Sequence, residues 1–461
     1  MKRQRRRERM RRWTNFLLAA AFCALTFFCL ARSSWGGQVR PDPGGARILT
    51  LAECLRLAEA HHPALAGADA AAAAERGRLS QTVAGDRVEI SGTASAARSG
   101  NQNGDSASYS VGASASVKVF DANRSKYAAD AQRKSLSAAE ANREQTLSQI
   151  RANVKSAYMN LLLCAAVQGQ RRESVDAFRR HLEQARGFYE AGSKARFDVT
   201  KAEVDLGNAE LALVEAESDI DVARASLLNA VGVEPFGKEP FELAPETDIF
   251  SSSPSSGSLS SGSLVSGAAF PEGDAESLAL EHRADYRAAG LRTLAGKSGL
   301  RAEARANSPS VSLRGGWSGG GDDLFSLDTS WNTGLSLSVP IADGGAAAAR
   351  LEIASAQIRS LEASMESLRQ DILLEVRKAS LGVKNARERI RITELTVVQA
   401  EENYTLAEGR YETGVGSALE ITDALLALTD ARLSAYRARH DLQIALINLE
   451  KATGTEFNRF D

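Results

Sequence analysis

The sequence predicts a mainly α-helical fold that is duplicated within the chain and that contributes strands to a transmembrane β-barrel. Three observations predict it: the chain repeats itself at an offset of 222 residues, long stretches contain no proline, and four short segments alternate apolar with small polar residues. With 461 residues, of which 43% are hydrophobic and 25% charged, the composition is that of a folded protein with a large core.

The N-terminal residues 1–36 are typical of a secretory signal peptide. A basic stretch, MKRQRRRERMRR, precedes an uncharged apolar run from Phe16 to Leu30, and small residues such as Ser34 and Gly36 follow. We expect cleavage near residues 34–37, because an apolar run of about 15 residues falls short of the ~20 that span a bilayer as a helix. A retained membrane anchor, or an N-terminal lipid, is the alternative for this segment.

Cleavage changes the charge of the chain. Residues 1–36 carry nine Lys or Arg and one Glu, so their removal takes the formal net charge from −2 to −10. Such an acidic chain does not suit a nucleic-acid partner. No other stretch is long and apolar enough for a transmembrane helix, so a role in a membrane must come from strands.

Internal repetition divides the rest of the chain into two halves. GFYEAGSKARFDVTKAEVDL, from Gly187, aligns without a gap with GRYETGVGSALEITDALLAL, from Gly409, and the same offset holds over about 120 residues. We expect a first repeat at 37–235 and a second at 273–461. The residues between them, 236–272, are rich in serine and typical of a flexible linker.

Each repeat is expected to contain one very long helix. Residues 124–190 and 346–411 contain no proline, and in the second stretch the apolar residues recur at mostly alternating steps of three and four, the pattern of a coiled coil. A helix of about 65 residues is about 100 Å long, far beyond the size of a globular domain. Shorter helices are expected at 50–84, 198–231, 274–306 and 417–453, so that two of them can lie end to end beside each long one.

Four strands are expected before the long helices, at about 87–97, 108–120, 310–318 and 329–340. In SYSVGASASVKVF, from Ser108, the large apolar residues occupy odd positions, with Ser, Gly and Lys between them. One apolar face and one small polar face over roughly ten residues are typical of a transmembrane barrel. A half-buried soluble sheet is the alternative. Four strands do not close a barrel in one chain, whereas three copies give twelve strands.

Several motifs resemble the outer membrane efflux protein family, the TolC-like outer membrane factors. They are LAECLRLAEAHHPAL from Leu51, VPIADGG from Val339, and the paired turns RGFYEAGSKARFDVTKAE and GRYETGVGSALEITDA. The resemblance implies a homotrimer in the cell outer membrane, with a twelve-stranded β-barrel in the lipid and a long α-helical coiled-coil tunnel in the periplasm. The Ser-rich linker would belong to the equatorial region of the tunnel. A periplasmic adaptor (membrane fusion) protein and an inner-membrane pump are the implied partners.

The resemblance also implies where the periplasmic end of the tunnel closes. The family closes it with carboxylates of the second-repeat turn, and the matching residues here are Glu420 and Asp423. They lie three residues apart on one helix face, which gives six carboxylates in a trimer. The alternative for Glu420 is a helix-capping role, because Ser417 precedes it by three residues as in a capping box. The first repeat has Asp198 and Lys201 at these places, so the acidic pair belongs to one turn only.

The resemblance also implies roles for residues at the closed tip and in the two turns. Tyr411 and Asp198 match family positions that tie the tip together, whereas the basic partner usual there would fall at Gly416, which has no side chain to supply it. Gly192 and Gly414 match the turns that adaptor proteins contact. The alternative for both is local geometry, because glycine suits a chain reversal.

The sequence indicates a channel and no enzyme. His61 and His62 form the only histidine cluster, without metal-type spacing, and we expect no catalytic residue, metal or cofactor. The resemblance implies the outer-membrane channel of a tripartite export system. A duct for type I protein secretion is an alternative within this class, and a trimeric structural or adhesive coiled coil with a barrel anchor is an alternative outside it.

Overall fold

The computed structural model describes residues 47–101, 104–233, 241–243, 272–323 and 326–455, and those from Ile48 onward belong to one compact unit. The expected signal peptide, residues 1–36, and nearly all of the Ser-rich segment, 236–272, lie outside the described residues.

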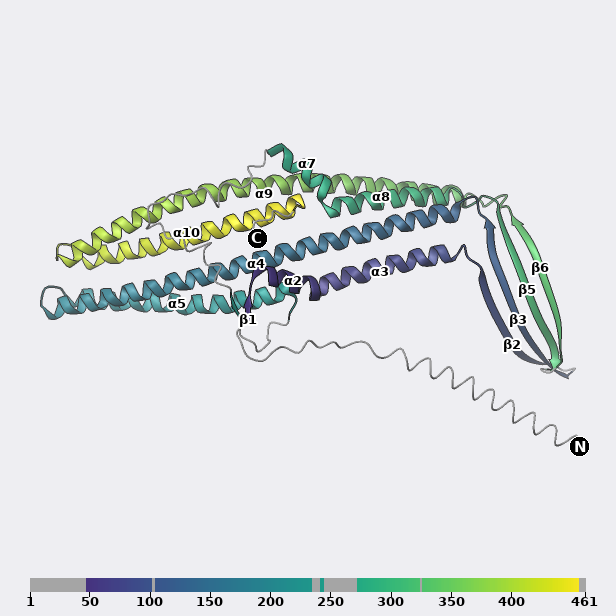
Figure 1. The fold of residues 1–461 in the computed structure, drawn as a ribbon, viewed down its shortest axis with the longest axis horizontal. Coiled ribbons are helices and arrows are strands. Elements are labelled where there is room, and N and C mark those ends of the chain that lie inside the picture. Colours follow the sequence, from purple (N-terminus) through teal and green to yellow (C-terminus); the bar gives the residue numbers. More distant parts are fainter. Residues whose placement is uncertain (1–46, 102–103, 234–240, 244–271, 324–325, 456–461) are drawn as a thin grey trace, which may run out of the picture. The chain divides into compact units, whose positions relative to one another are not determined.

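The two repeats contain the same elements in the same order (Figure 1). The first repeat consists of α2 (Leu51–His61), α3 (Pro63–Ala84), β2 (Glu89–Asn101), β3 (Gly104–Phe120), α4 (Arg124–Glu190) and α5 (Arg196–Val231). The second consists of α7 (Glu272–His282), α8 (Ala284–Glu303), β5 (Ser310–Asp323), β6 (Ser326–Ser338), α9 (Ala346–Glu412) and α10 (Ala418–Thr453). Two short strands, β1 (Arg47–Leu49) and β4 (Phe241–Leu243), pair with each other. The predicted class, mainly helical with four longer strands and an internal repeat, is confirmed.

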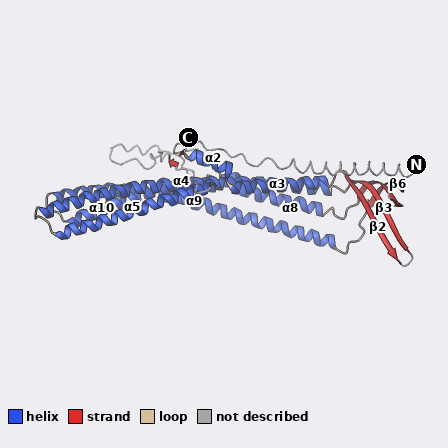
Figure 2. Ribbon diagram, turned by 90° about the horizontal axis from the view of Figure 1, so that it is seen from below, coloured by secondary structure: helices blue, strands red, loops and turns tan. Residues whose placement is uncertain are grey.

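The long helices α4 and α9 have 67 residues each and are therefore about 100 Å long. The returning helix α5 lies alongside α4, and α10 lies alongside α9 (Figures 1 and 2). Alanines recur every seven residues on the buried side of α5, at Ala202, Ala209, Ala216 and Ala223, which allows close approach. Within the described residues, no helix combines the length and the apolar character needed to cross a membrane.

The helix before the strands is broken in each repeat, and the expectation of single helices at 50–84 and 274–306 was wrong. His62 and Arg283 are extended at the two breaks, with ψ of 124° and 122°. Pro63 accounts for the first break, because proline has no N–H to continue a helix. The second break has no proline, and a shared packing arrangement explains both. A Cβ on Gly232 would lie 2.9 Å from the His62 Cα, and one on Gly454 would lie 3.2 Å from the Arg283 Cα, so each returning helix ends against a break.

The two repeats meet along α4, which contacts both α8 and α10. Between α4 and α8, the buried Ser298 hydroxyl donates to Asp130 and accepts from Lys134, each at 2.7 Å. The largest core cluster, which includes Cys54, Tyr158 and Leu227, joins α2, α4 and α5, with Ile447 of α10 also present.

The four longer strands form one antiparallel sheet in the order β2-β3-β5-β6. One face carries the apolar residues, such as Ile90 and Trp331, which are 77% and 78% exposed in the single chain. The other face carries serines that hydrogen-bond across the strands, at Ser91–Ser114, Ser95–Ser110, Ser312–Ser336 and Ser318–Ser330. All four strands extend further toward their connecting loops than the sequence-based bounds, because alternation weakens in the polar loop ends while the ladder hydrogen bonds continue.

Candidate functional site

The turns that join each long helix to its returning helix have the same geometry. Gly192 and Gly414 adopt φ of 74° and 76°, in the left-handed region that favours glycine. The next N–H after each glycine, of Ser193 and Val415, closes the turn on a carbonyl of the preceding helix at 3.0 Å. Both glycines therefore have a local structural role. A Cβ at either position would meet no other atom, so both also lie open to a partner.

Apolar side chains are exposed beside these turns. Phe197 and Leu419 occupy equivalent positions at the start of α5 and α10, and they are 74% and 57% exposed. Val415, in the second turn, is 72% exposed. All three apolar side chains lie within five residues of a turn glycine.

A lysine of the first turn holds the second turn. The Lys194 ammonium donates a hydrogen bond of 2.8 Å to the Gly416 carbonyl oxygen and lies 5.3 Å from the centre of the Tyr411 ring. We call this contact the tip latch. A Cβ at Gly416 would lie 3.0 Å from backbone atoms of Arg410 and Tyr411, so a side chain there would require the backbone of this turn to shift. A basic group nevertheless lies next to position 416, because Lys194 occupies the equivalent position of the other repeat. The offset of 222 residues was the signal in the sequence that could have found it.

Tyr411 lies at the centre of this tip and is fully buried. Its ring meets Phe188 edge-on at 5.5 Å and His181 at 5.1 Å, measured between ring centroids. Its hydroxyl has no hydrogen-bond partner among the described residues. Burial, and then the charge of the nearby Asp198, raise the pKa of Tyr411. Asp198 therefore lies close enough to Tyr411 for its charge to act on the ring hydroxyl, and no hydrogen bond joins the two among the described residues.

Other buried polar groups lie near the tip ends of α4, α5 and α10. His181, Asp205 and Thr422 are 4%, 7% and 1% exposed, and each has at least one polar atom without a partner in the described part of the chain. We call these three residues and Tyr411 the tip cluster. The other Asp205 oxygen accepts from Lys201. Burial lowers the pKa of His181 although Asp205 and Asp198 act in the opposite direction.

The two carboxylates expected at the gate have different surroundings. The Ser417 hydroxyl caps α10 by accepting from the Glu420 N–H at 3.2 Å, and Arg410 pairs with the Glu420 carboxylate at 3.2 Å. Glu420 therefore takes part in the N-terminal cap of α10 through its backbone N–H, while its carboxylate pairs with Arg410. Asp423 is exposed, and none of the hydrogen bonds or ion pairs between described residues involves its carboxylate. In the first repeat, Lys201 at the matching position is engaged by the buried Asp205.

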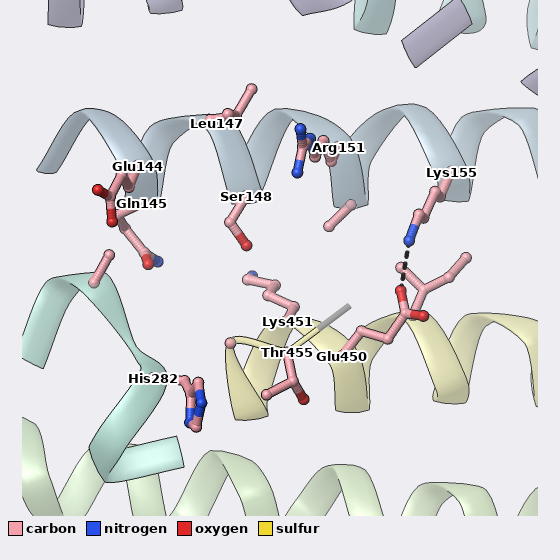
Figure 3. A pocket seen from close by; sticks show the side chains of 14 residues that line it. Glu144, Gln145, Leu147, Ser148, Arg151, Lys155, His282, Glu450, Lys451 and Thr455 are labelled. Atoms are coloured by element: carbon pink, nitrogen blue, oxygen red, sulfur yellow. Dashed lines mark hydrogen bonds and ion pairs between the residues drawn. The ribbon is translucent and has the colours of Figure 1, made fainter. Parts of the chain in front are cut away.

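A cavity of about 310 Å³ lies where α4, the α7–α8 break and the end of α10 meet (Figure 3). Its lining mixes charges of both signs, and Lys155 forms an ion pair of 2.6 Å with Glu450 there, both side chains being nearly buried. This pair ties the two repeats together.

His62, considered above as part of a cluster, accepts from the Ala64 N–H and caps α3. In the described ranges no group of three or more His, Cys, Asp or Glu is placed to hold a metal ion.

Comparison with known proteins gives a family match over both repeats. The family model described as "Outer membrane efflux protein" matches residues 54–233 and 276–455. Outer membrane protein OprJ of Pseudomonas aeruginosa is 29% identical over 179 residues, which cover 38% of this chain and 37% of that protein. Outer membrane protein TolC of Escherichia coli is 25% identical over 122 residues, which cover 26% of this chain and 25% of that protein. The matched parts therefore span little more than a third of these relatives at most.

Solved structures match over nearly the whole chain. A crystal structure of CusC superposes with a TM-score of 0.76 at 21% identity, covering 91% of this chain and 96% of that one. VceC of Vibrio cholerae gives a TM-score of 0.73 at 21% identity, covering 88% and 97%. The MtrE channel of Neisseria gonorrhoeae gives 0.73 at 19% identity, covering 92% and 96%. At such identities the comparison shows a common fold.

Proposed function

Since this chain belongs to the outer membrane efflux protein family and is an outer-membrane protein, we propose that it forms the outer-membrane channel of a tripartite export system. The observation that carries the proposal is the match of the family model to both repeats, residues 54–233 and 276–455. A periplasmic adaptor protein and an inner-membrane pump would deliver the substrate. A duct of this kind needs no catalytic residue, metal or cofactor of its own.

We propose that three copies assemble through their sheets. The strands β2 and β6 each pair on one side only within the four-stranded sheet, so each has an edge that another subunit can complete. The apolar face with Ile90 and Trp331 would meet outer-membrane lipid, and the serine face would line water. Twelve strands would then close one barrel, and the helices of the three chains would continue it as a tunnel in the periplasm.

The turns at Gly192 and Gly414 are proposed to contact the adaptor. Both glycines leave open space above the backbone, and Phe197, Leu419 and Val415 expose apolar surface beside them. A tip that presents such groups in three copies would offer six turns to a partner. The tip latch between Lys194 and Gly416 would keep the two turns of one subunit together.

Asp423 is proposed as the main charge of a periplasmic gate, with Glu420 beside it. Three copies would place six carboxylates around one axis. The Asp423 charge is available to passing ions, whereas Arg410 partly neutralises Glu420. Fixed negative charges in a narrow pore attract cations, and multivalent ones most strongly. The resting channel should therefore conduct poorly, prefer cations and be blocked by trivalent metal ions from the periplasmic side.

The test is the block by trivalent ions in planar bilayers. Asp423→Asn should weaken it at least about tenfold, because a loss of about 1.4 kcal/mol already changes binding tenfold and three ring charges that act on a trivalent ion are lost at once. Asp430→Asn is the matched control, since this exposed carboxylate lies seven residues further along α10, about 10 Å away. Lys201→Asn is a poor control because Lys201 is paired with the buried Asp205. An unchanged block in Asp423→Asn would show that the gate lies elsewhere.

A further inference from the structure

The tip cluster contains more unsatisfied polar groups than a buried site normally keeps. Both ring nitrogens of His181, one Asp205 oxygen, the Tyr411 hydroxyl and the Thr422 hydroxyl lack partners among the described residues. Buried polar atoms are nearly always hydrogen-bonded, so this concentration of unpartnered groups sets the tip cluster apart from the rest of the described core. The tip cluster adjoins the tip latch, because the His181 ring and the Lys194 ammonium both contact the Tyr411 ring.

We propose that His181 makes the closure of the tip sensitive to pH, and that its protonation loosens the tip latch. The proposal rests on the proposed function of the chain as a channel whose periplasmic tip closes. Protonated His181 would bring a second positive charge to the Tyr411 ring, which already holds the Lys194 ammonium. It would also present two N–H donors, and neither ring nitrogen has a hydrogen-bond partner among the described residues in the closed arrangement.

His181 lies between helices of the two repeats, so a charge on its ring would act on the packing of these helices. Ser174 and Thr429 hydrogen-bond at 3.3 Å, and Phe178 packs with Leu425 one turn nearer the tip. The helices α4 and α10 run antiparallel, so each helical turn toward the tip adds three or four residues on α4 and subtracts as many on α10. One turn beyond Phe178 and Leu425, His181 therefore lies opposite Thr422. We infer that hydration of a charged imidazole would separate this part of α4 from α10 and from Tyr411 of α9. That separation would pull Lys194 away from Gly416.

The groups around His181 determine the direction of the effect. They are Asp198, Lys201 and Asp205 from α5, Tyr411 from α9, Lys194 from the α4–α5 turn, and Thr422 from α10, which does not titrate. Burial lowers the pKa of His181 below its ordinary value of 6.5, and Lys201 adds to this, whereas Asp205 and Asp198 oppose it. An opened, hydrated tip would restore the ordinary pKa. The opened state therefore binds more protons than the closed state as the pH falls below about 6.5, and acid favours opening.

The experiment follows opening by the reactivity of a buried cysteine in the full-length assembled protein. Ala418 is 4% exposed and packs with Tyr411, so Ala418→Cys should react with a small methanethiosulfonate reagent only when the tip opens. Thr413→Cys, exposed in the same turn, corrects for the pH dependence of thiol reactivity, and the unsubstituted protein corrects for Cys54 and Cys164. We expect the corrected rate to rise severalfold from pH 7.5 to pH 5.5.

Variants of His181 decide whether this residue is responsible. His181→Gln keeps a polar side chain that does not titrate, and it should abolish the rise. His181→Phe preserves the ring contact with Tyr411 and should do the same if His181→Gln fails to assemble. His440→Gln is the matched control, since His440 also has a buried unpartnered nitrogen but lies on α10 about 20 residues beyond the turn. A flat profile in the unsubstituted background, or an equal rise in both His181 variants, would overturn the proposal.

A separate measurement distinguishes this proposal from the proposed gate. Block by trivalent ions at pH 7.5 depends on Asp423 whether or not His181 responds to pH. If Asp423→Asn left the block unchanged while labelling still depended on His181, the gate proposal would fail and the pH response of the turns would stand. If the block were lost and labelling did not depend on His181, the gate would stand and the pH response would fail.

Discussion

Removing the charge of Lys194 should release the tip latch. Lys194→Met keeps an unbranched side chain over the Tyr411 ring and deletes the ammonium that donates to the Gly416 carbonyl at 2.8 Å. A hydrogen bond to a charged group contributes about 1.5–3 kcal/mol, and an exposed cation–π contact about 0.5–1 kcal/mol. Lys194 is only partly buried, so the lower ends apply and sum to about 2 kcal/mol per subunit, roughly a 30-fold shift toward the released state.

Single-channel recording in planar bilayers measures this effect as the fraction of time in the open state. Arg196→Met is the matched control, because it removes the same charge two residues away from an exposed side chain that takes no part in the latch. We expect a marked rise in open fraction for Lys194→Met and little change for Arg196→Met. An equal rise in open fraction for the two variants would mean that net charge at the tip, and not the latch, controls opening. No change in either would refute the latch.

Two further predictions concern Tyr411 and the sheet. Tyr411→Phe should leave closure unchanged or strengthen it by up to about 1 kcal/mol, because the hydroxyl it removes is buried and has no partner in the described part of the chain. A hydrogen bond between this hydroxyl and Asp198 would instead predict a looser tip with a higher open fraction. Cysteines at Ser114 or Ser336 should react with small aqueous thiol reagents in the assembled channel, and cysteines at Val117 or Leu335 should not. The reason is that the two pairs lie on opposite faces of the sheet. The reverse pattern would mean that the register of the strands is wrong by one residue.

Periodic features of this protein were predictable from the sequence. The absence of proline from 124–190 and 346–411, with apolar residues every three or four positions, predicted the two 67-residue helices to within a residue at each end. Alternation predicted which strand residues share a face, as the cross-strand serine pairs show. These features are local, because helix and strand periods are set by backbone geometry and are written in neighbouring residues.

Contacts between the repeats were decided only by the tertiary structure. The glycine at position 416 suggested that a basic group was missing from the tip. The fold instead places Lys194, on a different hairpin and 222 residues earlier, against the Gly416 carbonyl. His181 carried no motif, and its contact with Tyr411 depends on how α4 packs against α9. The break at Arg283 likewise has no local signal and exists because α10 ends against it at Gly454. A periodic sequence specifies which face of each helix is buried, whereas the longitudinal register of one helix pair against the other depends on the side chains of both at once.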